Sequence, residues 1–507
     1  MREWDTLVAG TLLGTERQAP TLPPPAGPLG EVLGALDAEN PARQALSTAA
    51  ALSLYRRAGW LPARDAAAPT PAAEADDLPV CSSAAAVRLD LMLRGTHRNV
   101  LPEWLALMAH AGRRVPPEYL PALLEHGRNQ RELRPAILAV IGKRGRWLAA
   151  QNAAWDYSAD QLAPEEWDTG SRDARVALLA RMRAEDPEAA RTRLEGTWTQ
   201  ETPDDRARFL ALLATGLSMA DEPFLEAALD DRRKEVRKTA ADLLACLPES
   251  RFCARMVERV QPLVNLQRKL LGRAALELHL PEACNKAMLR DGIEAKPPQY
   301  SPLKLGEKAW WLLQMVASIP PQHWTLRFEK KPGELFEMAR KTEWKELLWE
   351  GWAQAAARTG NAEWAEAILM VRRQADETLR DLVRALSPSR RDALVLQMLA
   401  GEEGLWKNHA ALRVLAEHND PWSRELSRAV VDGVRTRLRA NARTHGNDWQ
   451  LYSALPDYAL RIPPSLLSEI EAGWPENSPS AEYWATSIQN FLAVLQFRGD
   501  MVQEISK

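Results

Sequence analysis

The stretch Asp231-Arg-Arg-Lys-Glu-Val-Arg-Lys-Thr-Ala-Ala-Asp-Leu-Leu244 decides the fold class of this chain. Its apolar residues, with the leucine that follows, occupy positions i, i+4, i+7, i+8 and i+11, which lie on one face of an α-helix. Charged residues fill most of the other positions, so the pattern predicts a helix with one face in a core and one in water. These apolar residues are Val236, Ala240, Leu243, Leu244 and Leu247.

The same form, a charged residue and an arginine followed by a Leu-Leu pair, occurs twice earlier. The first leucines of the three pairs lie 34 and then 31 residues apart. The segment from Asp231 resembles the second half of a HEAT-type repeat, although the spacing is shorter than the roughly 40 residues usual for that class. We therefore predict an all-α fold, an α-solenoid of HEAT-like helix pairs with helical N- and C-terminal regions. The pairs are Leu178-Leu179, Leu212-Leu213 and Leu243-Leu244, with second helices expected at 187–194 and 222–229.

Composition agrees with a helical, soluble protein. The 507 residues are 46% hydrophobic and 26% charged, and isoleucine occurs only 9 times, so few residues favour strands. No apolar run approaches the roughly 18 residues that span a bilayer. Asp5 stands where the apolar core of a secretory signal would begin. We expect a cytoplasmic protein.

Three segments rich in proline, glycine or alanine indicate boundaries: 20–28, 61–80 and 291–302. They predict an N-terminal helical region over 1–160 with a mobile loop near 61–80, a HEAT-like repeat region over 161–290, and a C-terminal helical region over 303–507. One segment is ambiguous between helix and strand. Residues 87–93 alternate apolar and polar, but Gly95 and the preceding alanines favour a helix. The leucines of 263–278 have helical spacing, and we expect a helix there too.

The usual catalytic and nucleotide-binding motifs are absent from the sequence, including phosphate-binding loops, His-Glu-x-x-His and Gly-x-Ser-x-Gly. We therefore assign no catalytic residue, cofactor or metal. A metal site from Cys246, Cys253, His279 and Cys284 could form only if the helices stacked, and buried free cysteine is commoner. An enzyme whose carboxylates and histidines meet only in the fold stays open, although a protein without catalytic activity is favoured.

Charge is uneven along the chain although the net charge is only −3. Residues 160–230 are acidic, whereas 232–273 and 128–146 are basic. Such charges are usually a solvated face, but on a solenoid they could meet a partner. In the segment 128–146 only Glu132 opposes the cations, so we predict that this surface binds a partner. Its candidate residues are Arg128, Arg131, Arg134, Lys143, Arg144 and Arg146.

The chain has 19 tryptophans, which is unusual. Packing between helices, with the indole N–H bonded to a backbone carbonyl, is favoured over an aromatic groove for a peptide. The tryptophans concerned are Trp310, Trp311, Trp344, Trp349, Trp352 and Trp364.

Three motifs resemble an uncharacterised bacterial family of helical-repeat proteins, classified as a domain of unknown function. They are Gly14-Thr-Glu-Arg-Gln18, Gly145-Arg-Trp-Leu-Ala-Ala-Gln-Asn152 followed by Trp155, and Phe491-Leu-Ala-Val-Leu-Gln-Phe-Arg-Gly-Asp-Met501. Ala153 replaces the proline of the family pattern. Genes of this family often lie beside those for a MoxR-type AAA ATPase, a von Willebrand A-type protein and a SWIM zinc-finger protein. The resemblance implies a helper or scaffold and carries over no catalytic residue.

Taken together, these observations favour a non-enzymatic scaffold or adaptor that binds protein partners, among them a MoxR-type AAA ATPase or a von Willebrand A-type protein. The alternative is a nucleic-acid-binding helical-repeat protein that uses the basic segments 128–146 and 232–273. The near-neutral total charge and the acidic segment 160–230 weigh against that alternative.

Overall fold

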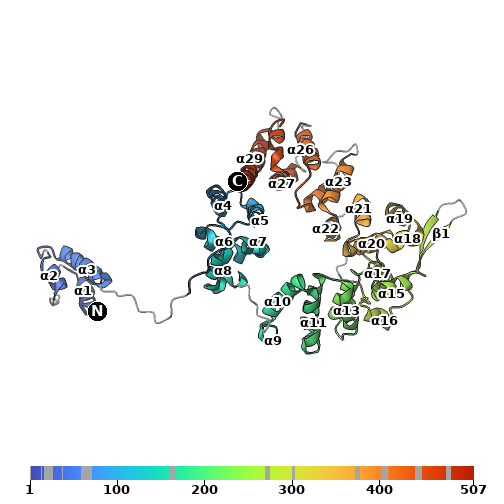
Figure 1. The fold of residues 1–507 in the computed structure, drawn as a ribbon, viewed down its shortest axis with the longest axis horizontal. Coiled ribbons are helices and arrows are strands. Elements are labelled where there is room, and N and C mark those ends of the chain that lie inside the picture. The colour runs from blue at the N-terminus through green and yellow to red at the C-terminus, as the bar shows by residue number, and fades with distance from the viewer. Residues whose placement is uncertain are drawn as a thin grey trace. The chain divides into compact units, whose positions relative to one another are not determined.

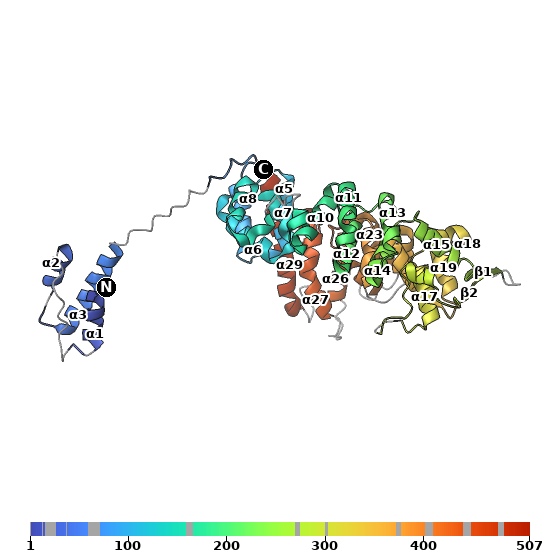
Figure 2. The ribbon, with the colours of Figure 1, turned by 90° about the horizontal axis from the view of Figure 1, so that it is seen from below.

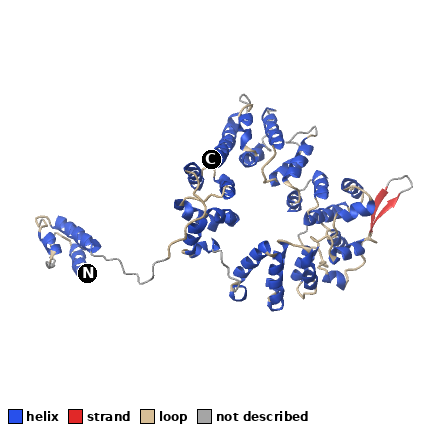
Figure 3. Ribbon diagram, in the orientation of Figure 1, coloured by secondary structure: helices blue, strands red, loops and turns tan. Residues whose placement is uncertain are grey.

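The computed structural model describes residues 2–12, 14–15, 27–36, 38–58, 71–158, 166–268, 274–299, 303–371, 377–400, 409–439, 448–474 and 481–506. These residues are mostly helical, as composition predicts, and their sheet is one two-stranded hairpin (Figure 3). None of the described helices combines the length and the apolar character needed to cross a bilayer. The chain divides into two compact units, residues 1–72 and 73–507.

The first unit consists of α1 (Arg2–Leu12), α2 (Pro28–Gly34) and α3 (Pro41–Ala58). Helices α1 and α3 lie side by side (Figure 1, Figure 2). Gly14 adopts a φ of 94°, which a residue with a Cβ rarely tolerates, just after α1 ends. The core is small: Leu7, Leu29, Ala45 and Leu52 are its buried apolar residues. Of the predicted proline-rich boundary 20–28, residues 20–26 lie outside the described residues.

The division between the units lies inside the expected 1–160 region. It falls in the segment 61–80 that we predicted as a loop; residues 61–70 lie outside the described residues, and 71–79 contain no helix or strand. The second predicted boundary, 291–302, does not separate compact units. There α15 (Arg251–Val260) packs on α17 (Glu307–Val316), and the Trp311 indole donates to the Ala295 carbonyl oxygen at 2.8 Å.

Many helices of the second unit begin at a serine, threonine or aspartate whose side chain accepts a backbone N–H, which explains where they start. The helices of its first half, capped or not, are α4 (Ser83–Leu93), α5 (Leu101–His110), α6 (Leu120–Asn129), α7 (Arg134–Val140), α8 (Gly142–Ala150), α9 (Glu166–Thr169), α10 (Arg172–Glu185), α11 (Pro187–Thr197), α12 (Pro203–Ala211), α13 (Glu222–Ala228), α14 (Lys234–Leu244), α15 and α16 (Lys286–Arg290). After α17 follow α18 (Gln322–Phe328), α19 (Pro332–Ala339), α20 (Lys345–Thr359), α21 (Ala362–Val371), α22 (Glu377–Arg384), α23 (Pro388–Leu399), α25 (His409–Glu417), α26 (Arg424–Arg439), α27 (Asp448–Arg461), α28 (Leu467–Ile470) and α29 (Ala481–Ser506). The helix predicted over 87–93 is confirmed as part of α4.

The three Leu-Leu pairs lie on helices that pack in order. Leu179 is on α10, Leu213 is on the 3₁₀ turn that ends α12, and Leu244 is on α14; all three are fully buried. Helix α10 packs on α12 and α12 packs on α14, while α11, α13 and α15 follow as second helices. The apolar faces of α10, α12 and α14 therefore pack on one another in sequence order.

The helix expected over 263–278 is wrong. The chain forms an antiparallel hairpin there, β1 (Val264–Arg268) and β2 (Ala274–Leu278), with Val264 opposite Leu278 and Leu266 opposite Leu276. These four residues alternate with polar ones, so a strand places them on one face. The helical expectation came from a different series, Leu263, Leu266, Leu270, Ala274 and Leu278, which is spaced by steps of three and four.

The last helix packs on the first helices of the second unit. Helix α29 contacts α4 and α5 (Figure 1). Arg498 on α29 is 3% exposed; it donates to both carboxylate oxygens of Glu103 on α5, at 2.6 and 2.9 Å, and to the Ala459 and Ile462 carbonyl oxygens. Arg88 on α4 donates to Glu504 and Asp500, each at 3.0 Å. Residues 73–158 therefore share a core with the C-terminal helices.

We predict that Arg498→Met lowers the free energy of unfolding by about 3–5 kcal/mol, because it leaves the Glu103 carboxylate and two carbonyls without their donor. The control is Arg94→Met, whose side chain is 76% exposed and pairs with Asp90 on its own helix. That pair should contribute at most about 1 kcal/mol. Urea unfolding followed by circular dichroism measures both. Equal losses in the two variants would show that α29 is not held by this contact.

Candidate functional site

The predicted partner-binding cations lie at the end of α6, in α7 and in α8, and most are exposed. Arg128 forms an ion pair with Glu125 one turn earlier, at 2.7 Å. Arg134 donates to the Gly127 carbonyl oxygen at 2.8 Å and lies over the Tyr157 ring at 4.5 Å from its centre. These two arginines stabilise the fold locally. Arg131 is exposed and forms no ion pair within the described residues.

Acidic residues of the segment 74–77 oppose the other cations. Lys143 pairs with Asp77 at 3.0 Å and with Glu74 at 3.5 Å. Asp76 accepts the backbone N–H of Arg144 at 3.3 Å and so caps the start of α8. The expectation that Glu132 alone opposes these cations is therefore corrected. The neutralising carboxylates lie 66 to 69 residues away in sequence, too far for a local pattern to indicate them.

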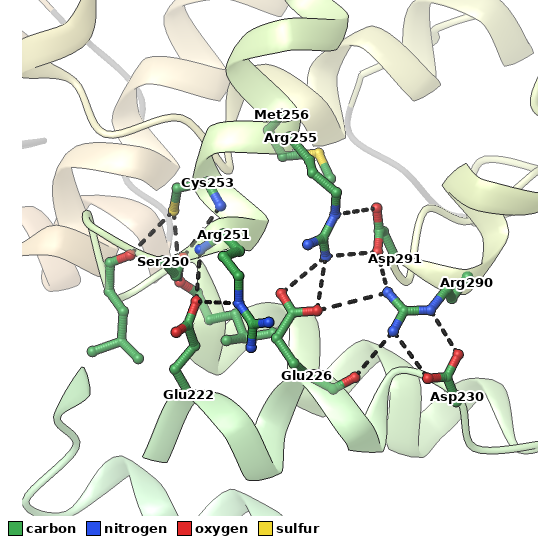
Figure 4. Close-up of polar contacts among 12 residues, drawn as sticks. Glu222, Glu226, Asp230, Ser250, Arg251, Cys253, Arg255, Met256, Arg290 and Asp291 are labelled. Atoms are coloured by element: carbon green, nitrogen blue, oxygen red, sulfur yellow. Dashed lines mark hydrogen bonds and ion pairs between the residues drawn. The ribbon is translucent and has the colours of Figure 1, made fainter. Parts of the chain in front are cut away.

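The acidic segment 160–230 and the basic segment that follows pair with each other. Figure 4 shows Arg255 on α15 donating to Glu226 on α13, at 3.2 Å, and to Asp291 after α16, at 3.0 and 3.2 Å. Arg290 bridges Asp230 and Asp291, at 2.6 and 3.2 Å. Asp291 is 2% exposed. These charges are therefore internal contacts between helix pairs.

A second pair is buried completely. Arg183 on α10 donates to both carboxylate oxygens of Asp221 before α13, at 3.0 and 3.1 Å, and both side chains are 0% exposed. Arg183 also donates to three carbonyl oxygens, which satisfies its remaining N–H groups. The partners Arg255–Glu226 and Arg183–Asp221 are separated by 29 and 38 residues, close to the 31 and 34 residues between the Leu-Leu pairs.

The candidate metal ligands do not come together. Among the described residues no group of three or more His, Cys, Asp or Glu side chains could hold a metal ion. The Cys253 thiol is buried and donates to the Leu247 carbonyl oxygen at 3.3 Å, and Cys246 donates to Asp242 at 3.3 Å. Burial raises the pKa of the Cys253 thiol to about 11, although the hydrogen bond from Ser250 opposes this shift.

One histidine and one carboxylate do meet in the fold. His418 lies 2.6 Å from Asp392, which also accepts the Ser423 backbone N–H at the start of α26, at 2.6 Å. Burial lowers the pKa of His418, although Asp392 opposes this effect. His418 is 0% exposed, so a substrate cannot reach its ring. The arrangement joins α23 to α26 and offers no accessible base.

Tryptophan packing is confirmed for the buried members of the set. Trp324, Trp352 and Trp364 are at most 1% exposed, and Phe336 and Trp352 lie edge to face with ring centres 5.3 Å apart. The expected bond from the indole N–H to a backbone carbonyl is wrong for Trp310, Trp352 and Trp364, whose indole nitrogens have no hydrogen-bond partner among the described residues. Trp311 and Trp349 do make that bond.

A cleft of about 460 Å³ lies against α19, α20 and α21. Trp349, Ile368 and Met370 supply its apolar lining, and the Lys345 ammonium lies 4.7 Å from the centre of the Trp349 ring. Its rim charges pair among themselves: Arg340 with Glu337 at 2.9 Å and Lys345 with Glu346 at 3.1 Å. Its described lining contains no serine, threonine, cysteine or histidine.

These features define a helical protein whose buried charges join its helix pairs. The chain belongs to the family of unknown function DUF5691, whose model matches residues 6–505. This match confirms the family resemblance indicated by the three motifs. No curated protein and no solved structure matches the chain.

We predict that Asp291→Asn lowers the free energy of unfolding by about 1.5–3 kcal/mol, because a buried carboxylate that accepts hydrogen bonds from partly exposed arginines loses its charge. Asp291 contacts Arg255, Arg259 and Arg290. Asp230→Asn is the matched control, since the Asp230 side chain is 66% exposed and should contribute about 1 kcal/mol or less. Thermal and urea unfolding compare the variants. A loss at Asp291 no larger than that at Asp230 would contradict the internal role of the cluster.

Cys253 should react slowly with thiol reagents. With its pKa raised to about 11, roughly one thiol in a thousand is ionised at pH 8. Ellman's reagent on the native chain, with the labelled peptides identified by mass spectrometry, should modify the half-buried Cys284 before Cys253. In denaturing urea the two rates should become similar. Rapid native labelling of Cys253 would mean that α15 opens readily.

Proposed function

We propose that this protein is a non-enzymatic helical-repeat scaffold or adaptor that binds protein partners, and that its second unit is an α-solenoid. The observation that carries the proposal is the order of packing: α10 contacts α12, α12 contacts α14, and α13 contacts α14. Ion pairs separated by about one repeat join successive helix pairs. Nearest-neighbour packing of this kind gives a long surface suited to holding other proteins.

Protein partners suit the charged surfaces better than nucleic acid does. A nucleic-acid site needs several cations free to replace counterions along a phosphate backbone. In the two basic segments Arg255, Arg259 and Lys143 already contact carboxylates of the chain itself. Fewer cations therefore remain for phosphates than the sequence suggests.

The family resemblance directs the choice of partners to test. We propose that the partner is a MoxR-type AAA ATPase or a von Willebrand A-type protein, as the family resemblance implies. The segment 128–146 remains the proposed docking surface, with Arg131 and Arg144 among its exposed cations. Because rim charges act mainly on encounter, an acidic partner face should associate faster in their presence.

The test uses the full chain with the purified ATPase and von Willebrand A-type protein in biolayer interferometry. We expect binding to at least one of them. The double variant Arg131→Glu with Arg144→Glu should slow association about three- to tenfold at low salt and leave dissociation nearly unchanged. The control is Arg384→Glu, whose side chain is 73% exposed on α22.

Gel shift with duplex and single-stranded DNA at about 150 mM salt tests the nucleic-acid alternative. Weak or absent DNA binding supports the scaffold. Tight DNA binding with a steep salt dependence, together with no affinity for either protein, would replace it with the nucleic-acid function.

A further inference from the structure

Helix α3 of the first unit has apolar side chains on two opposite faces. On one face Ala45, Thr48 and Leu52 are buried. Leu46, Ala50 and Leu54 stand at i, i+4 and i+8, which places them on the opposite face. Leu46 and Leu54 are 74% and 66% exposed. One apolar face of α3 therefore packs in the core of the first unit, and the second apolar face is exposed.

This exposure is concentrated in the first unit. Nearly half of the large apolar side chains that are exposed among the described residues belong to it, although it is the smaller unit. Isolated exposed leucines are common and need no explanation, but leucines in register along one helix face are typical of a binding surface. The exposed apolar residues of this unit are Val8, Leu12, Val32, Leu46, Leu54 and Tyr55.

Cations stand at both ends of the exposed face. Arg43 precedes Leu46 by three residues and Arg57 follows Leu54 by three, so both lie on the same face. Neither arginine forms an ion pair within the described residues, and α3 contains no acidic residue. By contrast, Arg56 lies toward the core side, over the Trp4 ring at 5.7 Å from its centre. We call the face formed by Arg43, Leu46, Ala50, Leu54 and Arg57 the α3 stripe.

We propose that the α3 stripe docks an amphipathic helix of an acidic protein partner. The cations are 14 residues apart, which is about 21 Å along a helix. The matching partner helix has leucines along one face and a glutamate or aspartate near each end of a four-turn segment. This proposal rests on the proposed function, since it names the chemistry of one partner contact.

A second copy of this chain does not fit the stripe. In an antiparallel pair Arg43 of one copy faces Arg57 of the other, and in a parallel pair each arginine faces its own equivalent. Like charges at both ends therefore oppose self-association, whereas acidic residues at both ends favour the proposed partner.

The probe is a synthetic four-turn helical peptide with leucines along one face and glutamate at both ends. A matched peptide has lysine in place of each glutamate. Fluorescence anisotropy with the full chain should show at least about tenfold tighter binding of the glutamate peptide at low salt. In the variant Arg43→Glu with Arg57→Glu the preference should reverse, so that the lysine peptide binds more tightly.

The double variant Leu46→Ser with Leu54→Ser should abolish binding of either peptide, and circular dichroism should show unchanged helicity because both side chains face water. The control is Leu326→Ser, which should leave the affinity for both peptides unchanged, because Leu326 is 77% exposed and lies on α18 of the second unit. Equal affinity for both peptides, or binding that is insensitive to the leucines, would overturn the proposal. So would dimerisation or adsorption to vesicles of anionic phospholipid, if the leucine variant abolished it.

The peptide experiment does not use the ATPase or the von Willebrand A-type protein. A charge-reversed preference in the peptides with no binding to either protein would leave the α3 stripe standing and refute those partners. Binding to those proteins that survives the leucine variant, with no peptide binding, would refute the stripe and leave the scaffold standing.

Discussion

Arginine side chains that reach carboxylates of neighbouring helices are the contacts on which the second unit depends. The Arg183 side chain is fully buried, and the Arg255 side chain is 28% exposed. Arg183 and Arg255 both reach a carboxylate of a neighbouring pair, and Arg183 also takes up backbone carbonyls at its turns. A guanidinium has five donors in a fixed plane, so it can join several acceptors from different helices at once. A buried carboxylate that lost this partner would be strongly unfavourable, which restricts how successive pairs can pack.

Because charged side chains pair within the chain, the acidic and basic segments do not by themselves indicate a binding partner. An acidic run followed by a basic run indicates two complementary surfaces, and in this chain Arg251 and Arg255 of the basic run pair with Glu222 and Glu226 of the acidic run (Figure 4). Asp76 and Asp77 act in the same way on the start of α8. The exposed cations of α3 differ because no carboxylate of the described chain opposes them. An unopposed charge beside an uncovered leucine is therefore the more informative signal of binding.

Local patterns in the sequence were sufficient for several of the helices. The stripe of Leu243 and Leu244 predicts α14, and Gly95 correctly favours a helix over a strand for 87–93. The hairpin at 264–278 was missed because Leu266 and Leu278 belong both to a series with steps of four and to alternating strands, and only the pairing of the two strands distinguishes the two structures. The surroundings of Lys143 could not be predicted, since its partners are more than 60 residues away. For α3 the sequence shows two apolar stripes, but only the packing of α1 and α2 reveals which of them is covered.

The contact between α29 and α5 cannot form until nearly the whole chain has been translated. Glu103 and Arg498 are separated by 395 residues. At the usual rate of about 5–20 residues per second, roughly 20–80 seconds pass between the translation of the two. During that interval α4 and α5 expose the apolar side chains that α29 later covers, which makes the nascent chain a substrate for chaperones. Non-local closure of this kind also slows folding, so the native N-terminal packing of this unit is among the last parts to form.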